Sequence, residues 1–449
     1  MTYFFETYGC QMNTAESAAL SLVLRERGWT VAEAGEKADL VILNTCSVRA
    51  TAEKRVLGRL AWYGALKKKR TFTLLVAGCM AQLRGEALKT QNRAVDYVMG
   101  TAARSVFPLI LESLEKGPEN ASGASVAGEE GRIGIEETPV FSFAPFHGEE
   151  GQFRALVPIM HGCNNFCSYC IVPYVRGREI SRDPLSILTE IDLLADRGVR
   201  EITLLGQNVN SYFWEGKIGF PELLELIVRR VEKTSIRWIR FLSSHPKDLS
   251  PRLIRVMADH AEFCRHLHLC VQHGSNTILA AMNRRYTREQ YLDLVAEIRD
   301  ALPGISLSTD ILIGFPGETD EDLEETLELM EKVKFLYAYM YHYNPREGTA
   351  AYELPGRISE ELKRDRLSRI IALQKRHTLE LLKGRIGCRE KVLVEGISRK
   401  NADELITRTE RDEMVAVSGA PSMIGFFAEV TLQSLRGNTF RGGGLMPAG

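Results

Sequence analysis

The chain has 449 residues, of which 45% are hydrophobic and 26% charged, a composition typical of a folded protein with about two to four domains. Its 57 Lys and Arg residues balance 58 Asp and Glu residues, so the overall charge says nothing for or against a nucleic-acid partner. No apolar run reaches the roughly 18 residues that cross a bilayer, and the N-terminus lacks the basic start and apolar core of a signal peptide. We therefore expect a cytoplasmic protein without a membrane partner, whose nine cysteines are reduced thiols.

Residues 1–116 alternate between strand and helix patterns. Short apolar and β-branched runs predict three strands, and two helical patterns lie between them. Such alternation is typical of a parallel sheet with helices on its faces, so this segment is predicted to be an open α/β domain. The strands are expected at Tyr3–Thr7, Leu40–Asn44 and Thr73–Ala77, and the helices at Ala15–Arg27 and Ala50–Lys68.

Residues 117–151 are predicted to be a linker. The stretch is rich in Gly, Ser, Ala and Glu, and it holds seven acidic residues but a single basic one, Arg132. Its low hydrophobicity disfavours packing into a core.

Three cysteines follow the linker within one short loop. Cys163, Cys167 and Cys170 have C-x3-C-x2-C spacing and come directly after an apolar run. Three thiolates on one tight loop can bind three irons of a four-iron cluster and leave the fourth iron open for chemistry. A zinc site usually needs four ligands, often from two C-x2-C pairs, and a disulfide framework needs an oxidising compartment. We therefore interpret the loop as an iron–sulfur site.

Residues 152–375 repeat a strand–helix unit about six times. This repetition predicts a partial (β/α)6 barrel with its chemistry at the carboxyl ends of the strands, where the Cys163–Cys170 loop would lie. The strands are expected at Arg154–Met160, Glu201–Gly206, Trp238–Ser243, His266–Val271, Ser306–Ile313 and Tyr337–Tyr343, and the helices at Ser186–Arg197, Pro221–Lys233, Pro251–His260, Arg288–Leu302 and Glu321–Val333.

Cys10, Cys46 and Cys79 form a second candidate set in the N-terminal segment. Each follows a predicted strand, and the same ends of adjacent parallel strands lie close together because neighbouring strands are about 4.8 Å apart. A second site with three thiolates follows from this placement, and three ordinary buried thiols are the alternative. The other cysteines, at positions 264, 270 and 388, are interpreted as structural.

Residues 376–449 change to four short strand patterns, which predict a small β-barrel. Residues 359–400, which lead into it, hold twelve Lys and Arg against six Asp and Glu. A basic stretch beside a small barrel suits contact with RNA phosphates, and a solvated helix face is the alternative. The strands are expected at Glu390–Glu395, Glu404–Thr407, Met414–Val417 and Phe427–Leu432.

Five further stretches, at Thr7–Asn13, Asn44–Arg49, Ala77–Gln82, Tyr174–Glu179 and Gly314–Thr319, complete a pattern that covers nearly the whole chain. Together with the cysteine loop they resemble the radical S-adenosylmethionine (SAM) methylthiotransferase family, and within it the MiaB-type branch. Cys270–Ser275 departs from the family's more usual Pro-Leu-Gln-Ser-Gly-Ser.

The resemblance implies two [4Fe-4S] clusters and SAM as cofactors. The three cysteines of the Cys163–Cys170 loop would bind the cluster that holds SAM, and Cys10, Cys46 and Cys79 would bind an auxiliary cluster. The C-terminal barrel would be a TRAM-like domain that holds tRNA.

Other polar residues near the predicted strand ends are candidates for the SAM and substrate pockets, although each could instead satisfy loop backbone. For SAM they are Tyr169, Gln207, Ser243, Gln272 and Asp310, and for the substrate Arg176, Arg178 and Arg346.

The activity that the resemblance implies is insertion of a methylthio group at carbon 2 of N6-isopentenyladenosine at position 37 of tRNA, beside the anticodon. The target C–H has no acidic proton and no leaving group, so we expect radical chemistry and no acid–base catalyst. A monomer is expected, which would need an electron donor and a sulfur donor that the sequence does not identify. The alternatives are a sister methylthiotransferase acting on threonylcarbamoyladenosine in tRNA or on a ribosomal protein, and a non-catalytic iron–sulfur RNA-binding or sensor protein.

Overall fold

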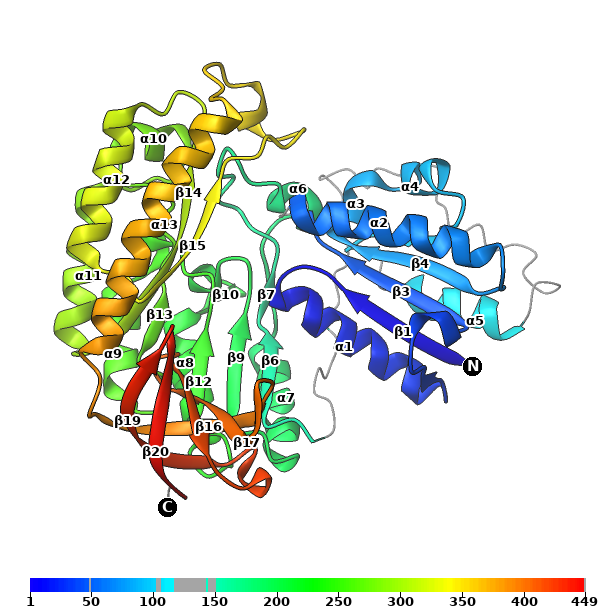
Figure 1. Ribbon diagram of the computed structural model, residues 1–449. Coiled ribbons are helices and arrows are strands. Elements are labelled where there is room, and N and C mark those ends of the chain that lie inside the picture. The colour runs from blue at the N-terminus through cyan, green and yellow to red at the C-terminus, as the bar shows by residue number, and fades with distance from the viewer. Residues whose placement is uncertain (48–49, 102–105, 117–142, 144–150, 448–449) are drawn as a thin grey trace.

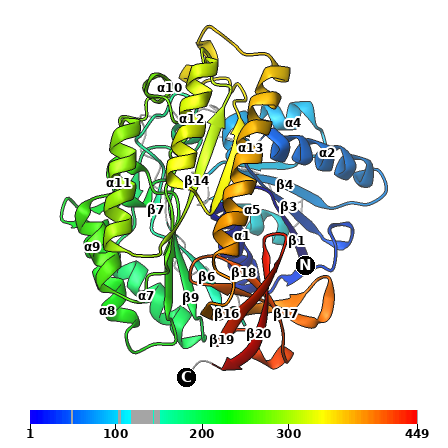
Figure 2. The ribbon, with the colours of Figure 1, turned by 60° about the vertical axis from the view of Figure 1, so that its left-hand side comes forward.

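The computed structural model describes residues 1–47, 50–101, 106–116, 143 and 151–447, which form three parts (Figure 1). An N-terminal sheet with helices lies beside a partial barrel, and a small β-barrel lies at one end of that partial barrel in both views (Figures 1 and 2). The predicted linker at 117–151 falls almost entirely outside the described residues. Among the described helices, none combines the length and apolar character required to span a bilayer.

The N-terminal sheet is parallel, with the strand order β2-β1-β3-β4-β5. The central strand β3 is buried along its whole length because α2 packs on one face of the sheet and α1 and α5 pack on the other. The predicted open parallel sheet is thus confirmed. The strands are β1 (Thr2–Thr7), β2 (Thr30–Val31), β3 (Leu40–Thr45), β4 (Thr73–Gly78) and β5 (Tyr97–Met99), and the helices are α1 (Gln11–Glu26), α2 (Ala50–Lys67), α3 (Cys79–Arg84), α4 (Ala87–Gln91) and α5 (Phe107–Lys116).

Two details of this part differ from the prediction. α1 begins at Gln11 rather than Ala15, with Cys10 as its N-cap residue, because its mostly polar first turn shows no apolar period. The edge strands β2 and β5 are too short to give an alternating pattern.

The central part is a partial barrel of six parallel strands. Two three-stranded sheets, β6-β9-β12 and β13-β14-β15, are joined by parallel bridges from Ile239 to Phe263 and from Ser244 to Leu269. The predicted (β/α)6 architecture is confirmed. The strands are β6 (Arg154–Pro158), β9 (Glu201–Leu205), β12 (Trp238–Phe241), β13 (His266–His268), β14 (Ser306–Ile313) and β15 (Tyr337–His342), and the outer helices are α7 (Pro184–Asp196), α8 (Phe220–Val231), α9 (Pro251–Asp259), α11 (Arg288–Ala301) and α12 (Asp320–Val333).

Short elements decorate the carboxyl ends of these strands. They include α6, which directly follows the cysteine loop, and α10, which lies between β13 and α11 in the chain. Their bounds are β7 (Met160–His161), α6 (Val172–Arg176), β8 (Ile180–Ser181), β10 (Phe213–Trp214), β11 (Ile218–Gly219) and α10 (Asn276–Ala281).

The C-terminal part is a closed barrel with the order β16-β17-β18-β20-β19. The small β-barrel is confirmed, but the prediction of four strands is wrong, because β20 closes the barrel as a fifth. Its run of glycines at 442–444 hides the strand pattern. The strands are β16 (Arg389–Ser398), β17 (Asn401–Thr409), β18 (Met414–Ser418), β19 (Phe427–Arg436) and β20 (Thr439–Pro447).

One helix, α13 (Glu360–Lys383), joins the two barrels and runs through the boundary expected after residue 375. The Gln374 amide donates to the Phe335 carbonyl at 2.8 Å, and the Thr378 hydroxyl donates to the Leu336 carbonyl at 2.7 Å. Leu382, near its C-terminal end, packs in the core of the small barrel. The helix therefore fixes one barrel to the other.

Candidate metal centre

The loop that carries Cys163, Cys167 and Cys170 is held tightly at the carboxyl end of the first barrel strand. Gly162 adopts φ 79°, and a Cβ there would lie 1.9 Å from the Arg178 carbonyl oxygen. Its backbone N–H donates to the Gln207 side-chain oxygen at 2.6 Å. This glycine is therefore required for the chain to turn into the loop.

The far side of the same loop is fixed by the segment that ends α10. The Ser168 hydroxyl donates to the Ala281 carbonyl at 2.8 Å, and the Asn283 amide donates to the Phe166 carbonyl at 3.0 Å. Phe166 itself has φ 47°, a left-handed conformation that costs energy for a residue with a side chain. Such over-determined geometry fixes the directions of the three thiols.

The electrostatics of this loop favour a bound cation. Burial raises the pKa of the Cys163 thiol to about 11 and that of the Cys170 thiol to about 12, so thiolates here need a positive partner. Arg284 supplies one, since its Nη1 atom lies 3.3 Å from Cys167 Sγ. A metal cluster would supply the rest.

The second set of cysteines also comes together. Cys10, Cys46 and Cys79 follow β1, β3 and β4, which are adjacent in the sheet. The loops touch closely at two glycines: a Cβ at Gly9 would lie 2.6 Å from Cys46 Cβ, and a Cβ at Gly78 would lie 2.5 Å from the Thr45 carbonyl oxygen. Only glycine permits this approach of the three loops.

In the second set, as in the first, burial disfavours a thiolate and a nearby guanidinium favours it. Burial raises the pKa of the Cys79 thiol to about 12, while the nearby Arg176 guanidinium favours its thiolate. Arg176 is itself paired with Glu16, with Nη1 2.7 Å from Oε1. In the second set Cys46 and Cys79 are buried and Cys10 is exposed. In both sets three thiols and one buried guanidinium fit the donor requirements of a [4Fe-4S] cluster with three cysteine ligands.

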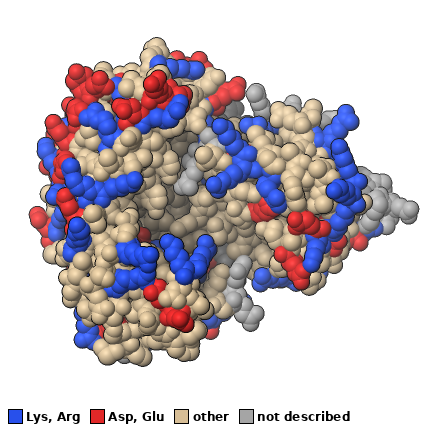
Figure 3. Space-filling view, viewed as in Figure 1, with Lys and Arg blue, Asp and Glu red and all other residues tan. Residues whose placement is uncertain are grey.

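The two sets lie on either side of one interface. α6, which starts two residues after Cys170, packs on α3, which begins with Cys79. Val175 of α6 is buried against Cys79, and the Thr101 hydroxyl donates to the Val175 carbonyl. Figure 3 shows a hollow between the barrel and the N-terminal part on the viewer's side, with Lys and Arg side chains around it.

Three family models match parts of the chain. The Radical SAM superfamily matches residues 157–330, Uncharacterized protein family UPF0004 matches residues 2–100, and the TRAM domain matches residues 385–443.

Curated relatives extend over the whole length. The tRNA-2-methylthio-N(6)-dimethylallyladenosine synthase of Treponema pallidum (strain Nichols) is 52% identical over 98% of this chain and 98% of its own. The enzyme of the same name from Syntrophus aciditrophicus is 43% identical over 97% of this chain and 93% of its own. The chain belongs to the tRNA-2-methylthio-N(6)-dimethylallyladenosine synthase family.

A solved structure supports the fold. A radical SAM methyltransferase, TsrM from Kitasatospora setae, solved with cobalamin and a [4Fe-4S] cluster, superposes with a TM-score of 0.61 over 78% of this chain and 77% of its own, at 17% identity.

In this member of the synthase family, the candidates for SAM binding gather around the barrel mouth. Ser243 and Gln272 both have left-handed backbones, with φ 66° and 68°, just beyond β12 and β13. Tyr169 packs beside a buried cluster that contains Phe315. Asp310 lies on β14, and its Oδ2 atom is 3.2 Å from Cys270 Sγ. Gln207 is already engaged, since its side-chain oxygen holds the Gly162 N–H.

The three arginines proposed for substrate contact have different settings in the structure. Arg176 pairs with Glu16, and Arg346 Nη1 lies 2.8 Å from Glu53 Oε2, so both join the N-terminal part to the barrel. Arg178 is exposed, with its guanidinium 4.3 Å from the Phe166 ring centroid.

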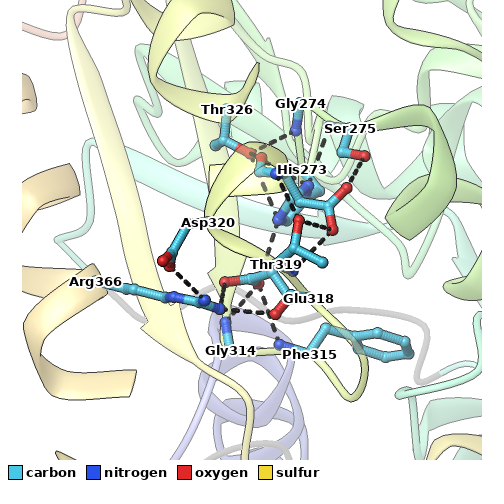
Figure 4. A network of polar contacts seen from close by, with 11 residues as sticks. His273, Gly274, Ser275, Gly314, Phe315, Glu318, Thr319, Asp320, Thr326 and Arg366 are labelled. Atoms are coloured by element: carbon cyan, nitrogen blue, oxygen red, sulfur yellow. Dashed lines mark hydrogen bonds and ion pairs between the residues drawn. The ribbon is translucent and has the colours of Figure 1, made fainter. Parts of the chain in front are cut away.

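Sequence reasoning missed the network that fixes the Gly314–Thr319 stretch (Figure 4). The Glu318 carboxylate accepts from the Gly314 N–H at 2.6 Å and from Arg366 of α13 at 2.9 Å. His273 Nε2 lies 3.2 Å from the same carboxylate. The motif itself is visible in the sequence, but no local signal points to Arg366 or to Arg284.

Proposed function

We propose that this chain is a radical SAM methylthiotransferase that modifies carbon 2 of N6-isopentenyladenosine at position 37 of tRNA. Its relatives carry the matching name over nearly its whole length. The observation that carries the proposal is the gathering of two three-thiol sets at one interface, beside a barrel of the radical SAM type.

Each thiol set is proposed to hold one [4Fe-4S] cluster. A reduced cluster bound by the barrel loop would supply the electron for cleavage of SAM, and a cluster bound by the second set would supply a site for the sulfur that is transferred. The protein's task is to fix the thiols and exclude water, which the tight glycine turns and the burial of four of the six thiols support. The barrel loop contributes Cys163, Cys167 and Cys170, and the sheet contributes Cys10, Cys46 and Cys79.

SAM is proposed to lie at the barrel mouth, where Ser243 and Gln272 follow strand ends, Tyr169 lies in the cysteine loop, Asp310 lies within β14, and Gln207 positions the cysteine loop. The strained backbones at Ser243 and Gln272 support a functional role, because such conformations cluster at binding sites.

The tRNA is proposed to approach the hollow in Figure 3, held by the TRAM barrel and by exposed basic residues such as Arg178. Phosphate contacts would provide affinity, and the target adenine would leave its stack to reach the mouth. The chain would act as a cytoplasmic monomer with separate electron and sulfur donors.

The test uses anaerobically reconstituted protein with SAM, dithionite and isopentenylated tRNA. We expect about eight irons per chain, release of 5′-deoxyadenosine, and the 2-methylthio nucleoside by mass spectrometry. Cys46→Ala should lower iron to about four and abolish methylthiolation while SAM cleavage persists. Cys388→Ala, which changes a thiol outside both sets, is the matched control. Fully loaded protein that yields no 5′-deoxyadenosine would contradict the proposal.

A further inference from the structure

A third group of metal-binding side chains lies on the inner face of the partial barrel. His268 and Cys270 are two residues apart, and Asp310 lies on the neighbouring strand β14. The chain after β13 stays alongside β14, since the Leu269 N–H donates to the Ser308 carbonyl and the Gln272 N–H donates to the Asp310 carbonyl, at 2.8 and 2.9 Å. Because side chains alternate along a strand, all three project from the same face.

The spacing of their donor atoms suits a tetrahedral metal ion. Cys270 Sγ and His268 Nε2 lie 3.2 and 3.4 Å from Asp310 Oδ2, and all three donor atoms are within 4.8 Å of one another. Zinc bonds of about 2.0–2.3 Å place neighbouring ligand atoms about 3.3–3.8 Å apart. The His–Asp separation is also longer than the roughly 2.7–2.9 Å of a charge-assisted hydrogen bond.

Neighbouring residues orient the imidazole for this role. Ser308 Oγ lies 2.9 Å from His268 Nδ1 and 2.9 Å from His266 Nε2. With Ser308 beside Nδ1, the other ring nitrogen of His268, Nε2, is directed at Asp310 Oδ2. A hydrogen bond on the other ring nitrogen is the usual support of a metal-bound histidine.

The group is shielded on one side and open on another. His268 is buried, whereas Asp310 is partly exposed, and Tyr339 of β15, whose ring lies 5.6 Å from that of His268, is 54% exposed. Three ligands from a buried wall with an open fourth position are typical of zinc sites that accept water or another ligand.

We propose that His268, Cys270 and Asp310 bind one Zn²⁺ ion, with its fourth position facing the barrel interior. Mixed nitrogen, sulfur and oxygen donors favour a borderline ion such as zinc over Mg²⁺ or Ca²⁺. The site shares no residue with either three-thiol set. It assigns Asp310 a partner besides SAM, and it gives a role to Cys270, a position at which the family more usually carries proline.

The positive charge of Arg284 lies close to the proposed site and would repel a bound cation. Its Nη2 donates to the Cys270 carbonyl at 2.7 Å, and its Nη1 faces Cys167. In the metal-free arrangement the Cys270 thiol donates to the Asp310 carboxylate. When zinc binds, the Cys270 thiol loses its proton, and the ion with one thiolate and one carboxylate is neutral, so the loaded site places no net positive charge beside the guanidinium.

The test uses the holoenzyme with both iron–sulfur clusters loaded, so that cluster cysteines do not compete for zinc. One equivalent of Zn²⁺ is added, loosely bound metal is removed, and zinc is measured by plasma mass spectrometry and by X-ray absorption at the zinc edge, which iron does not obscure. We expect about one zinc per chain with one sulfur at about 2.3 Å and three nitrogen or oxygen neighbours at about 2.0–2.1 Å.

Two variants and a control make the assignment specific. Cys270→Ser should remove the sulfur neighbour, and Asp310→Asn should weaken zinc retention about 10-fold or more, while Cys388→Ser should retain both. Absence of stoichiometric zinc, a shell with two or more sulfurs, or zinc that is unchanged in both variants would overturn the proposal. Iron content and 5′-deoxyadenosine yield, measured in the same samples, report on the proposed enzyme function separately.

Discussion

Arg176 of α6 and Glu16 of α1 form an ion pair that is almost fully buried, with Arg176 Nη1 2.7 Å from Glu16 Oε1 and the two side chains 3% and 5% exposed. Arg176 ends the helix that follows the barrel cysteine loop, and Glu16 lies in the helix that begins just after Cys10. The pair therefore links the supports of the two thiol sets.

Breaking this pair from one side should be costly. Glu16→Gln leaves the buried Arg176 guanidinium without its carboxylate partner, so we expect a loss of about 3–5 kcal/mol in the free energy of unfolding. Anaerobic urea denaturation measures this loss. The double variant Glu16→Gln/Arg176→Met, which removes the stranded charge, should recover part of it. A single variant as stable as the parent would show that the pair does not hold the interface.

Arg284 should tune the barrel cluster through its contact with Cys167 Sγ at 3.3 Å. Arg284→Met removes a positive charge beside the thiolates, so the cluster should become harder to reduce and SAM cleavage should fall about 10–100-fold. Redox titration followed by electron paramagnetic resonance measures the midpoint potential. Arg284→Lys keeps the charge and should shift the potential less. Equal shifts in both variants would rule out an electrostatic role.

Glu318 should control the shape of the mouth through the Gly314 N–H and Arg366. Glu318→Ala frees the loop and leaves Arg366 without this partner, so we expect the KM for SAM to rise about 10-fold or more, as when other supporting residues are removed from a site. Glu324→Ala, which removes an exposed partner of Arg369 on the outer helices, is the control. Iron content should stay unchanged in both, and a KM change in the control alone would contradict the assignment.

Glu6 makes the stability of the N-terminal sheet depend on pH. Burial favours its neutral form, but hydrogen bonds from Arg59, Tyr63 and Tyr8 outweigh burial and lower the pKa of the carboxyl. A lowered folded pKa means that the carboxylate stabilises the fold above the unfolded pKa of about 4.3, and that this stabilisation disappears as the pH falls through the folded pKa.

We therefore expect the parent to be about 1.5–3 kcal/mol more stable than Glu6→Gln at pH 7. The difference should shrink once the pH falls below about 4. Urea denaturation of both proteins at several pH values measures this. A difference that grows on acidification would reverse the sign and exclude the mechanism.

Arg399 and Lys400 are exposed at the turn between β16 and β17 and should bind tRNA phosphates. Removing each charge that neutralises a phosphate should lower the slope of log affinity against log salt by about 0.7–0.9. Replacing both with Ala should therefore weaken binding and flatten the salt dependence, as measured by filter binding. Lys37→Ala, an exposed lysine paired with Glu33, is the control. An unchanged slope in the double variant would place the RNA elsewhere.

Sequence alone was sufficient where a local pattern repeats. Strand–helix alternation placed Cys10, Cys46 and Cys79 at adjacent strand ends, and the sheet order β1-β3-β4 brings them together. β20 was not predicted, because its consecutive glycines interrupt the alternation of apolar and polar residues that indicates a strand.

Interactions between distant segments could not be predicted in this way. Arg284 meets Cys167 across 117 residues of sequence, and Asp310 meets Cys270 across 40. Such pairings depend on how whole elements pack, and a single sequence carries no periodic sign of them.

The helix α13 connects the two barrels and also fixes the distance between them. It has 24 residues, which corresponds to about 36 Å. Its first half is tied to the loop at the barrel mouth through Arg366, and its end is embedded in the small barrel. If the small barrel holds tRNA as proposed, a nucleotide would react only when its distance from the bound RNA backbone matches the length of α13. The enzyme would then select its substrate partly by the distance between the bound RNA backbone and the target nucleotide, in addition to any contact with the base.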